Sequence, residues 1–386
     1  MQILLDARKL GDGGIGVYLQ NLVDGLLALR QSGEIAFELS MLVSPEALSI
    51  ARWQGQVELI AERSGKYSIA EYLLLARRQR VALAKRPLFH SPHYTLPFGL
   101  RCPTVVTIHD CIHLSHPSRM LNPIVARPLL RSALRRAGRV ITVSEFSRAE
   151  LLRYFPSVRQ TIDVVPNGCQ VEFRDRLDER RIAEARLRLG ISAPYCLFVG
   201  NAKLHKGFRE LIDAWKLVGA ELGEQRPQLV VVGSGFSPTH RAAVAAECGE
   251  RGVRFLSGLS VSDLHALTQG ALASLLPSRI EGFGLPALEA LTVGTPVVCS
   301  PAPALKELCQ DSAWFADDFT ARTFAAAVSR VIRDPHGAAL KAERGRQRGA
   351  RFTIEKMGRE TWRVYASLLG VSADTGSQPT LRGGIY

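Results

Sequence analysis

Short runs of apolar and β-branched residues alternate along the chain with longer segments in which apolar positions recur every three or four residues. In the first half, the short runs predict strands at 2–6, 37–43, 88–92, 104–110, 139–144 and 162–167. The longer segments predict helices at 17–30, 69–84, 124–137 and 146–154. Strands that alternate with helices in this way predict a parallel sheet with helices on both faces.

The alternation restarts after residues 174–190, a highly charged segment that predicts a linker or a surface helix. Strands are expected at 195–200, 228–233, 253–257, 273–277, 295–300 and 313–316, and helices at 207–219, 238–250, 261–270, 285–293 and 303–308. The predicted fold class is therefore α/β, with two Rossmann-like, doubly wound domains over 1–173 and 191–351. Ligands of such folds bind beyond the carboxyl ends of the strands, which predicts a site in the cleft between the domains. An amphipathic helix over 352–370 and a frayed tail over 371–386 follow.

Composition narrows the class of protein. With 386 residues, 46% hydrophobic and 22% charged, the chain is expected to be a soluble globular protein with two cores. Asp6 and Arg8 interrupt the only early apolar run, so neither a signal peptide nor a membrane-spanning segment is predicted. The seven cysteines are scattered without a C-x-x-C pair, which predicts reduced thiols, a cytoplasmic protein and no zinc site.

The formal charge of +13 is concentrated in two windows of the first domain, 76–86 and 127–139. One interpretation is a solvated helix face; the other is attraction to an anionic membrane surface or an acidic lipid-linked substrate. Nucleic acid is disfavoured, because no nucleic-acid-binding motif accompanies the charge. The candidate membrane or acceptor patch consists of Arg77, Arg78, Arg80, Arg127, Arg131 and Arg135.

The segment 277–298, PSRIEGFGLPALEALTVGTPVV, reads as a strand end, a loop with two glycines and a helix. Gly282 and Gly284 allow backbone amides to approach a ligand, and the helix start adds partial positive charge, so the loop is a candidate diphosphate cradle. Glu281 and Glu289 flank it, and ionised carboxylates suit the vicinal hydroxyls of a ribose and a sugar. A nucleotide-sugar carries both diols on either side of one diphosphate. The alternative is a loop charge and a helix-dipole partner.

The stretch EGFGLPALE, with these two glutamates eight positions apart, resembles the signature of the retaining glycosyltransferases of family 4, which have the two-domain GT-B fold. VGNAKLHKGF (199–208), TIHDCIHLSHP (107–117), FHSPHYTLP (89–97) and VSEFSRAEL (143–151) are similar to further segments of that family. The resemblance implies that the first domain, joined by the helix 352–370, binds the acceptor and that the second binds a nucleotide-sugar donor.

The resemblance also implies roles for individual residues. Glu281 would hold the donor sugar, Glu289 the nucleotide ribose and Lys206 the leaving diphosphate. His109 would position the sugar or its acceptor, while His205 stands where the family more often has arginine, so its role is open. The implied catalytic residues are His109, Lys206 and Glu281, and the implied donor-binding residues are Gly14, Gly16, Gly200, His205, Lys206, Glu281, Gly282, Phe283, Gly284, Leu285 and Glu289.

The stretch GDGGIGVY (11–18) also satisfies G-x-G-x-x-G, the fingerprint of dinucleotide-binding oxidoreductases. Here ARKL separates the first strand from the glycines, and the second strand ends at Val43 without the acidic residue that binds ribose in that fold. GGIGVY instead resembles the loop with which the glycosyltransferase family approaches the donor phosphate. Gly14 and Gly16 would then offer backbone amides to the ligand.

The implied function is transfer of mannose from GDP-mannose, as in the bacterial branch that assembles O-antigen and exopolysaccharide. The acceptor would be a lipid-linked oligosaccharide at the inner face of the cytoplasmic membrane. A UDP-sugar donor such as UDP-glucose is the alternative. No cofactor and no metal are expected, since no D-x-D stands in a plausible place. A sugar-nucleotide epimerase is disfavoured by the glutamate pair, and an inactive scaffold by the presence of Lys206 and both glutamates.

Overall fold

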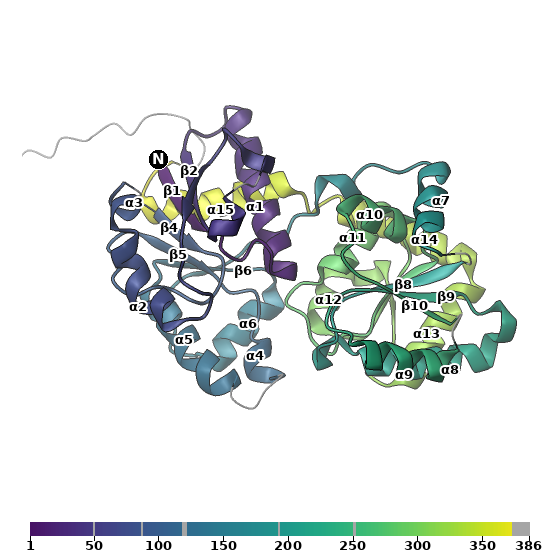
Figure 1. Cartoon of the computed structure of the whole chain (residues 1–386). Helices are drawn as coiled ribbons and strands as arrows, with labels where there is room; N and C mark the ends of the chain where they lie inside the picture. Colours follow the sequence, from purple (N-terminus) through teal and green to yellow (C-terminus); the bar gives the residue numbers. More distant parts are fainter. Residues whose placement is uncertain (49–50, 86–87, 118–121, 192–193, 250–251, 373–386) are drawn as a thin grey trace, which may run out of the picture. The chain divides into compact units, whose positions relative to one another are not determined.

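The computed structural model of the chain describes residues 1–48, 51–85, 88–117, 122–191, 194–249 and 252–372, and divides into two compact units (Figure 1). Of the described residues, the first unit contains 1–114, 122–168 and 354–372. The second contains 115–117 and 169–353. From residue 373 onward, the predicted tail 371–386 lies outside the described residues.

The first unit is built on a seven-stranded sheet in the order β3-β2-β1-β4-β5-β6-β7, in which every pair of neighbours is parallel. Its strands are β1 (Gln2–Asp6), β2 (Glu38–Val43), β3 (Glu58–Ala61), β4 (Leu88–Ser91), β5 (Thr104–Thr107), β6 (Arg139–Thr142) and β7 (Ile162–Val164). The helices are α1 (Gly13–Gln31), α2 (Ile69–Arg78), α3 (Arg80–Ala84), α4 (Ile112–Ser115), α5 (Asn122–Arg136), α6 (Glu145–Tyr154) and α15 (Ile354–Leu369). Central strands such as β1, β4 and β5 are buried on both faces, as their apolar runs predict.

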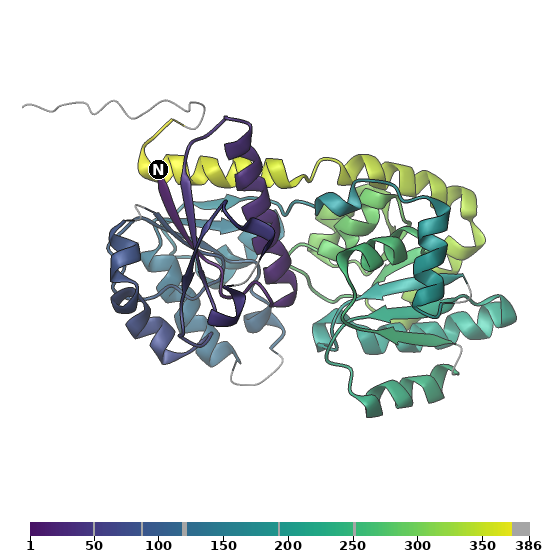
Figure 2. The same ribbon diagram turned by 45° about the horizontal axis from the view of Figure 1, so that its top comes forward.

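The last helix, α15, lies against α1 in this unit, although more than 300 positions separate the two helices in the sequence. A side chain at Gly25 of α1 would meet the Ile354 carbonyl oxygen at 2.1 Å, and one at Gly358 would meet the Gly25 backbone at 2.5 Å. The two helix backbones therefore touch, and glycine at both positions allows it. Both ribbon views show the contact (Figures 1 and 2).

The second unit has a six-stranded sheet in the order β10-β9-β8-β11-β12-β13, again parallel throughout. Its strands are β8 (Tyr195–Val199), β9 (Gln228–Val232), β10 (Val253–Leu256), β11 (Ala273–Leu276), β12 (Val297–Cys299) and β13 (Trp314–Phe315). Its helices are α7 (Glu179–Arg188), α8 (Phe208–Leu222), α9 (Pro238–Cys248), α10 (Val261–Gln269), α11 (Leu285–Val293), α12 (Pro303–Cys309), α13 (Ala321–Arg333) and α14 (Pro335–Gly349).

The predicted α/β class, with two doubly wound parallel sheets, is confirmed. Residues 174–190 were predicted to form a linker or a surface helix; residues 179–188 of this segment form a helix, α7, which belongs to the second unit and packs on α10. Ile182 and Ala185, three positions apart, supply its buried face. In the part of the chain that the structure describes, no helix combines the length and the apolar character that crossing a bilayer requires.

Candidate functional site

In the second unit, two loops follow the carboxyl ends of adjacent strands. Residues 200–207 join β8 to α8, and residues 277–284 join β11 to α11. Because β8 and β11 are parallel neighbours, both loops leave the same edge of the sheet, where ligands of doubly wound folds bind. The loops carry Lys206 and Glu281, the two residues of this unit to which the sequence assigns catalysis.

The side chains of Lys206 and Glu281 form an ion pair. The Lys206 Nζ lies 2.8 Å from Oε1 and 2.9 Å from Oε2 of Glu281, so one ammonium group is held by both carboxylate oxygens. Ser278 Oγ donates a third hydrogen bond, of 2.7 Å, to Oε1. The Glu281 side chain is 9% exposed and that of Lys206 20%, so the pair is largely shielded and the lysine is its more exposed member. The sequence did not predict a role for Ser278, although this residue stands three positions before Glu281 in the same loop.

Backbone contacts fix the two loops to each other. The Arg279 N–H donates to the His205 carbonyl oxygen at 2.8 Å, and the Arg279 guanidinium pairs with Glu210 in the first turn of α8 at 2.5 Å. Gly207 has φ of +66°, and a Cβ there would lie 2.1 Å from the Pro277 carbonyl oxygen. Only glycine fits at this crossing. His205 is buried, and its carbonyl oxygen takes part in the contact between the two loops.

The second glutamate, Glu289, lies in α11 and is 6% exposed. Within the described residues its carboxyl group has no hydrogen-bond or ion-pair partner, and burial raises its pKa to about 8. The helix begins after Gly284, whose φ of +103° requires glycine and whose Cβ would lie 2.6 Å from a Leu305 methyl group. Leu285 is therefore the first helical residue, and α11 presents its N-terminal amides at the end of the glycine loop.

Two of the other predicted donor-binding residues, Gly200 and Phe283, have packing roles. Gly200 directly follows β8, and a Cβ at Gly233, which directly follows β9, would lie 1.6 Å from its carbonyl oxygen. Phe283 is buried, with its ring 5.8 Å from that of Phe352. Gly282 lies between Glu281 and Phe283 in the loop.

In the first unit, His109 follows the carboxyl end of β5. Its Nε2 lies 3.0 Å from the Pro92 carbonyl oxygen, and its own carbonyl accepts a hydrogen bond of 2.8 Å from Ser147. Since a carbonyl oxygen can only accept, Nε2 carries the proton and Nδ1 is left as an acceptor. Burial lowers the pKa of His109, which favours the neutral ring. The ring stands edge-on to Tyr18 of α1, 4.6 Å away.

The glycine loop of this unit forms the beginning of α1. Gly13 has φ of +48°, and side chains at Gly13 or Gly14 would meet open space within 4 Å. Gly16 differs: its N–H donates to the Asp12 carbonyl at 3.2 Å, and a Cβ there would lie 2.2 Å from the Leu10 carbonyl oxygen. Of the two amides assigned to the ligand, that of Gly16 is thus used inside the helix, whereas Gly14 lies in the first turn, where amides lack an intrahelical acceptor.

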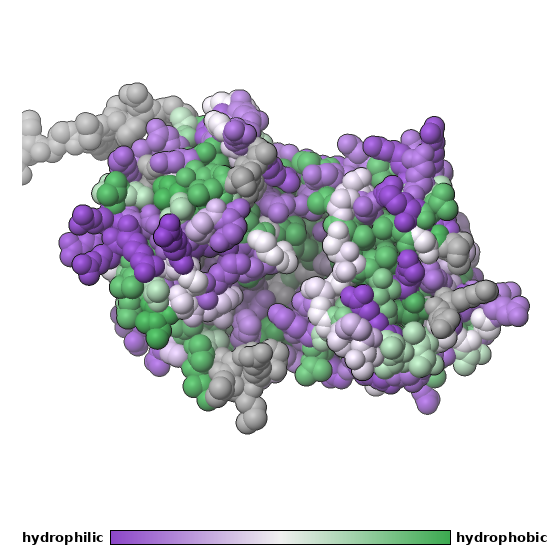
Figure 3. Space-filling model, viewed as in Figure 1, coloured by the Kyte–Doolittle hydropathy of each residue, from purple (hydrophilic) through white to green (hydrophobic). Residues whose placement is uncertain are grey.

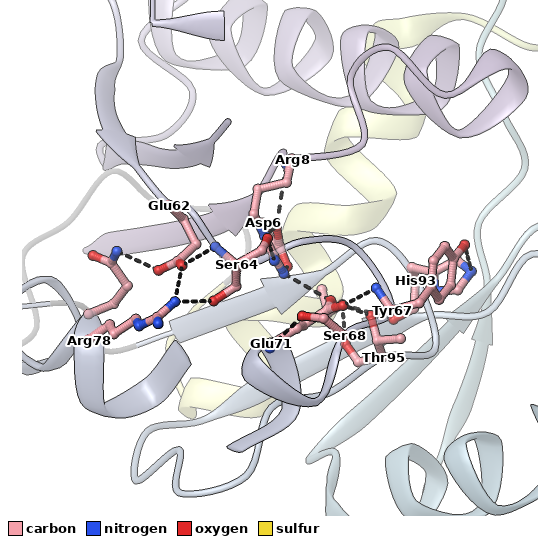
Figure 4. A network of polar contacts seen from close by, with 12 residues as sticks. Asp6, Arg8, Glu62, Ser64, Tyr67, Ser68, Glu71, Arg78, His93 and Thr95 are labelled. Atoms are coloured by element: carbon pink, nitrogen blue, oxygen red, sulfur yellow. Dashed lines mark hydrogen bonds and ion pairs between the residues drawn. The ribbon is translucent and has the colours of Figure 1, made fainter. Parts of the chain in front are cut away.

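Beside this loop lies a buried network that the sequence analysis missed, drawn in Figure 4. The Arg8 guanidinium donates to Asp6 at 2.8 and 2.6 Å, to Glu71 at 2.9 Å and to the Ser64 carbonyl at 3.0 Å. Thr95 donates to Glu71 as well, at 2.9 Å. The network fastens the start of α2 to the carboxyl end of β1. Arg8 directly follows a predicted strand, which is a signal, but nothing local in the sequence points to Glu71.

The basic residues assigned to a membrane or acceptor patch lie on α2, α3 and α5, and all six are exposed. Exposed apolar side chains share these helices: Ile69, Leu73, Leu74, Val81, Ile124 and Val125. The space-filling view shows hydrophilic and hydrophobic side chains next to one another on this side of the first unit (Figure 3). At the end of α5, Arg131, Arg135 and Arg159 help to line a surface hollow of about 360 Å³.

Comparison with known proteins matches both units to families. Residues 12–173 match the model "Glycosyltransferase Family 4", and residues 182–350 match "Glycosyl transferases group 1". O-antigen chain mannosyltransferase B of Escherichia coli is 27% identical over 373 residues, covering 92% of this chain and 96% of that protein. O-antigen chain mannosyltransferase RfbU of Salmonella typhimurium is 24% identical, covering 86% and 92%. The crystal structure of Anabaena HepE in complex with UDP-glucose superimposes with a TM-score of 0.76 at 18% identity, covering 95% of this chain and all of that one.

Proposed function

The chain belongs to glycosyltransferase family 4, and from that premise we propose that it transfers mannose from GDP-mannose, with retention of anomeric configuration, to a hydroxyl group of a lipid-linked oligosaccharide. The observation that carries the proposal is the Lys206–Glu281–Ser278 arrangement at the carboxyl ends of β8 and β11. This arrangement brings together, at one edge of the sheet, the ammonium group of a partly exposed lysine, a shielded carboxylate and the start of a helix. These are the groups that a sugar diphosphate needs.

The ion pair between Lys206 and Glu281 describes the donor site before the donor binds. Without donor, Glu281 neutralises Lys206. When the diphosphate of the donor arrives, it competes for the ammonium group and releases carboxylate lone pairs, which then accept hydrogen bonds from hydroxyls of the sugar. As the glycosidic bond breaks, negative charge grows on the leaving diphosphate. Lys206 and the amides at the start of α11 stabilise that charge more strongly in the transition state than in the ground state.

Glu289 and His109 complete the assignment. Glu289 binds the ribose hydroxyls, which supply the hydrogen bonds that its buried carboxyl group lacks within the described residues. His109 positions the sugar or the acceptor through Nδ1, the ring nitrogen that the Pro92 carbonyl leaves available. A neutral ring with a lowered pKa suits an acceptor of hydrogen bonds rather than a base that holds a full proton.

The choice of mannose rests on the names of the relatives. Two proteins that align over most of this chain are O-antigen mannosyltransferases. UDP-glucose, the ligand of the structurally similar HepE, is the competing donor.

The donor is therefore tested by measuring the thermal shift of the protein with GDP, UDP, ADP and NADH, each with and without EDTA. A ligand at about a hundred times its dissociation constant adds about 2.7 kcal/mol of stability. Stabilisation by GDP alone supports the mannosyl donor, whereas stabilisation by UDP alone would replace it.

Matched variants tie that result to the site. Lys206→Met is expected to abolish the GDP-induced shift and the transfer of mannose from GDP-mannose. Lys203→Met removes an exposed lysine three positions earlier in the same loop and is expected to leave both unchanged. If the two variants behave alike, the diphosphate is not held by Lys206.

We also propose that the first unit associates with the inner face of the cytoplasmic membrane through α2, α3 and α5. Exposed arginines supply attraction to anionic lipid, at about 1 kcal/mol each near the surface, and the neighbouring exposed apolar side chains can enter the headgroup region. Vesicle flotation with anionic lipid should recover the protein, and high salt should release it. Equal recovery with neutral and anionic vesicles would contradict the assignment.

A further inference from the structure

The carboxyl end of β1 holds two consecutive basic residues in opposite situations. The Arg8 guanidinium has hydrogen-bond acceptors on several sides, since it donates to Asp6, to Glu71 and to the Ser64 carbonyl. Glu71 in turn accepts from Thr95 at 2.9 Å and from the Tyr67 N–H at 2.5 Å. Both buried carboxylates beside this strand end are therefore engaged with other donors (Figure 4).

Lys9, the next residue, is only 4% exposed, and its Nζ has no hydrogen-bond partner within the described residues. The ammonium lies against the face of the Tyr67 ring, 3.5 Å from its centroid. Burial lowers the pKa of Lys9 to about 8, although Glu71, Asp6 and Asp12 act in the opposite direction. A ring face replaces part of the lost hydration but leaves all three N–H donors unused. A lysine with a purely structural role would be paired or reach solvent.

Tyr67 covers Lys9 in a strained conformation. Its φ of +60° lies in the left-handed region, which is unusual for an aromatic residue, while its side chain is 51% exposed. Its hydroxyl lies 3.1 Å from Nε2 of His93, and these two rings are joined in Figure 4. The His93 ring is buried, and its Nδ1 is a second nitrogen without a partner within the described residues. One partly exposed ring thus contacts both side chains that carry an unpartnered buried nitrogen.

A tight turn connects this cluster to the start of α1. The Asp12 N–H donates to the Lys9 carbonyl at 2.9 Å, and α1 begins at Gly13. A Cβ at Gly11, Gly13 or Gly14 would meet no atom within 4 Å, so the region in front of the helix is open. Lys9, with its three N–H donors, and the first amides of a 19-residue helix both favour negative charge.

We propose that Lys9, Tyr67 and His93 form a subsite of the first unit that binds an anionic oxygen-bearing group of the acceptor, a phosphate or a carboxylate. The inference deepens the proposed function, on which it rests for the identity of the ligand as an acceptor. The anion accepts hydrogen bonds from the Lys9 ammonium in place of the Tyr67 ring face. His93 binds a neighbouring hydroxyl or anion oxygen through Nδ1. The subsite makes such an anionic group a determinant of acceptor specificity.

The test measures binding of inorganic phosphate, and separately of acetate, to the full chain by titration calorimetry, with GDP or UDP saturating the donor site. Wild-type protein is expected to bind at least one of the two anions. Lys9→Met should weaken that binding about tenfold or more, the loss of one charge-assisted hydrogen bond. The matched control is Lys66→Met. It removes an exposed lysine that lies beside the same loop and forms an ion pair with Asp12. Binding of phosphate but not of acetate would indicate a phosphorylated acceptor, and binding of acetate but not of phosphate would indicate a carboxylated one.

A second readout distinguishes a binding residue from a structural one. Because Lys9 is buried without a hydrogen bond, methionine of similar length should leave the melting temperature unchanged or raise it. A clear fall in melting temperature, anion binding equal in Lys9→Met and wild type, or no binding of either anion by wild type would each overturn the proposal. These outcomes do not depend on which nucleotide occupies the donor site or on sugar transfer, so failure of this proposal is distinguishable from failure of the proposed function.

Discussion

Replacing Glu289 by glutamine separates folding from ligand binding at the proposed ribose site. The side chain is buried in α11 without a hydrogen-bond partner in the described part of the chain, and burial alone raises its pKa to about 8. Glutamine keeps the shape of the side chain and removes the charge. We therefore expect Glu289→Gln to stabilise the ligand-free protein in alkaline solution and to weaken the binding of a nucleotide.

The size of the effect follows from linkage between folding and protonation. A carboxyl group with a pKa of 4.5 in the unfolded chain and about 8 in the folded protein takes up a proton on folding between these values. Stability from this group is fully present below pH 4.5 and is lost as the pH rises through 8. At 1.36 kcal/mol per pKa unit, the loss approaches about 5 kcal/mol, an upper value because relaxation and water entry reduce it. The variant needs no proton and escapes this loss.

Urea unfolding of both proteins at about pH 5 and about pH 8.5 measures this difference. The gain from Glu289→Gln should be small at the lower pH and reach a few kcal/mol at the higher pH. Ribose hydroxyls donate to the ionised carboxylate, so GDP binding should release a proton and strengthen as the pH rises towards 8. Calorimetry in two buffers of different ionisation enthalpy detects that proton. A gain that is equal at both pH values, with GDP affinity unchanged by the substitution, would refute the reasoning.

Three further predictions concern the loops and the core. Glu281→Gln removes the competitor for Lys206, so calorimetry should show GDP binding several-fold tighter while mannose transfer is lost; weaker GDP binding would contradict the ion-pair account. Gly207→Ala should destabilise the second unit by about 3 kcal/mol or more in urea, because its Cβ meets the Pro277 carbonyl at 2.1 Å. Gly223→Ala, with φ of +56° but no atom within 4 Å, should lose about 1 kcal/mol. Tyr365→Phe deprives the buried His90 Nδ1 of its hydrogen bond of 2.6 Å and should lower the unfolding free energy by about 1–3 kcal/mol; an unchanged value would mean that water replaces the hydroxyl.

The sequence predicts the strands of the two sheets well where both faces are buried, because a continuous apolar run needs no knowledge of its neighbours. β8 and β9 follow the expected runs closely. The edge strand β3 (Glu58–Ala61) was missed, since its residues are exposed or only partly buried and give a weak apolar signal. The helix predicted over 69–84 is divided into α2 and α3 at Gln79, which caps both. For the segment that contains α7, the sequence left a linker and a surface helix open, because the buried face of α7 consists of only two residues.

The candidate site residues of the second unit and those of the first unit differ in the same respect. In the second unit, Glu281 and Glu289 lie in one continuous strand–loop–helix, so spacing along the chain predicts their positions around the loop. In the first unit, Lys9, Tyr67 and His93 come from three separated segments. No local pattern reports that Arg8 takes both nearby carboxylates and leaves Lys9 without one. Burial of a charged group is a property of the assembled fold, which single-sequence patterns do not contain.

The same physical feature appears independently in each unit. At the carboxyl end of β1, a lysine is buried without a hydrogen bond beneath a tyrosine with a strained backbone. In the helix after β11, Glu289 is 6% exposed and has no hydrogen-bond partner within the described residues, and this helix begins after a glycine whose φ is +103°. Burial of a charged group without a hydrogen-bond partner, and strained backbone beside it, each lower the stability of the folded chain. A sequence selected for stability alone would replace both residues, so their cost is best explained by ligands that complete their hydrogen bonds. The charges fit the two proposals: hydroxyl groups as ligands of the glutamate and an anion as the ligand of the lysine.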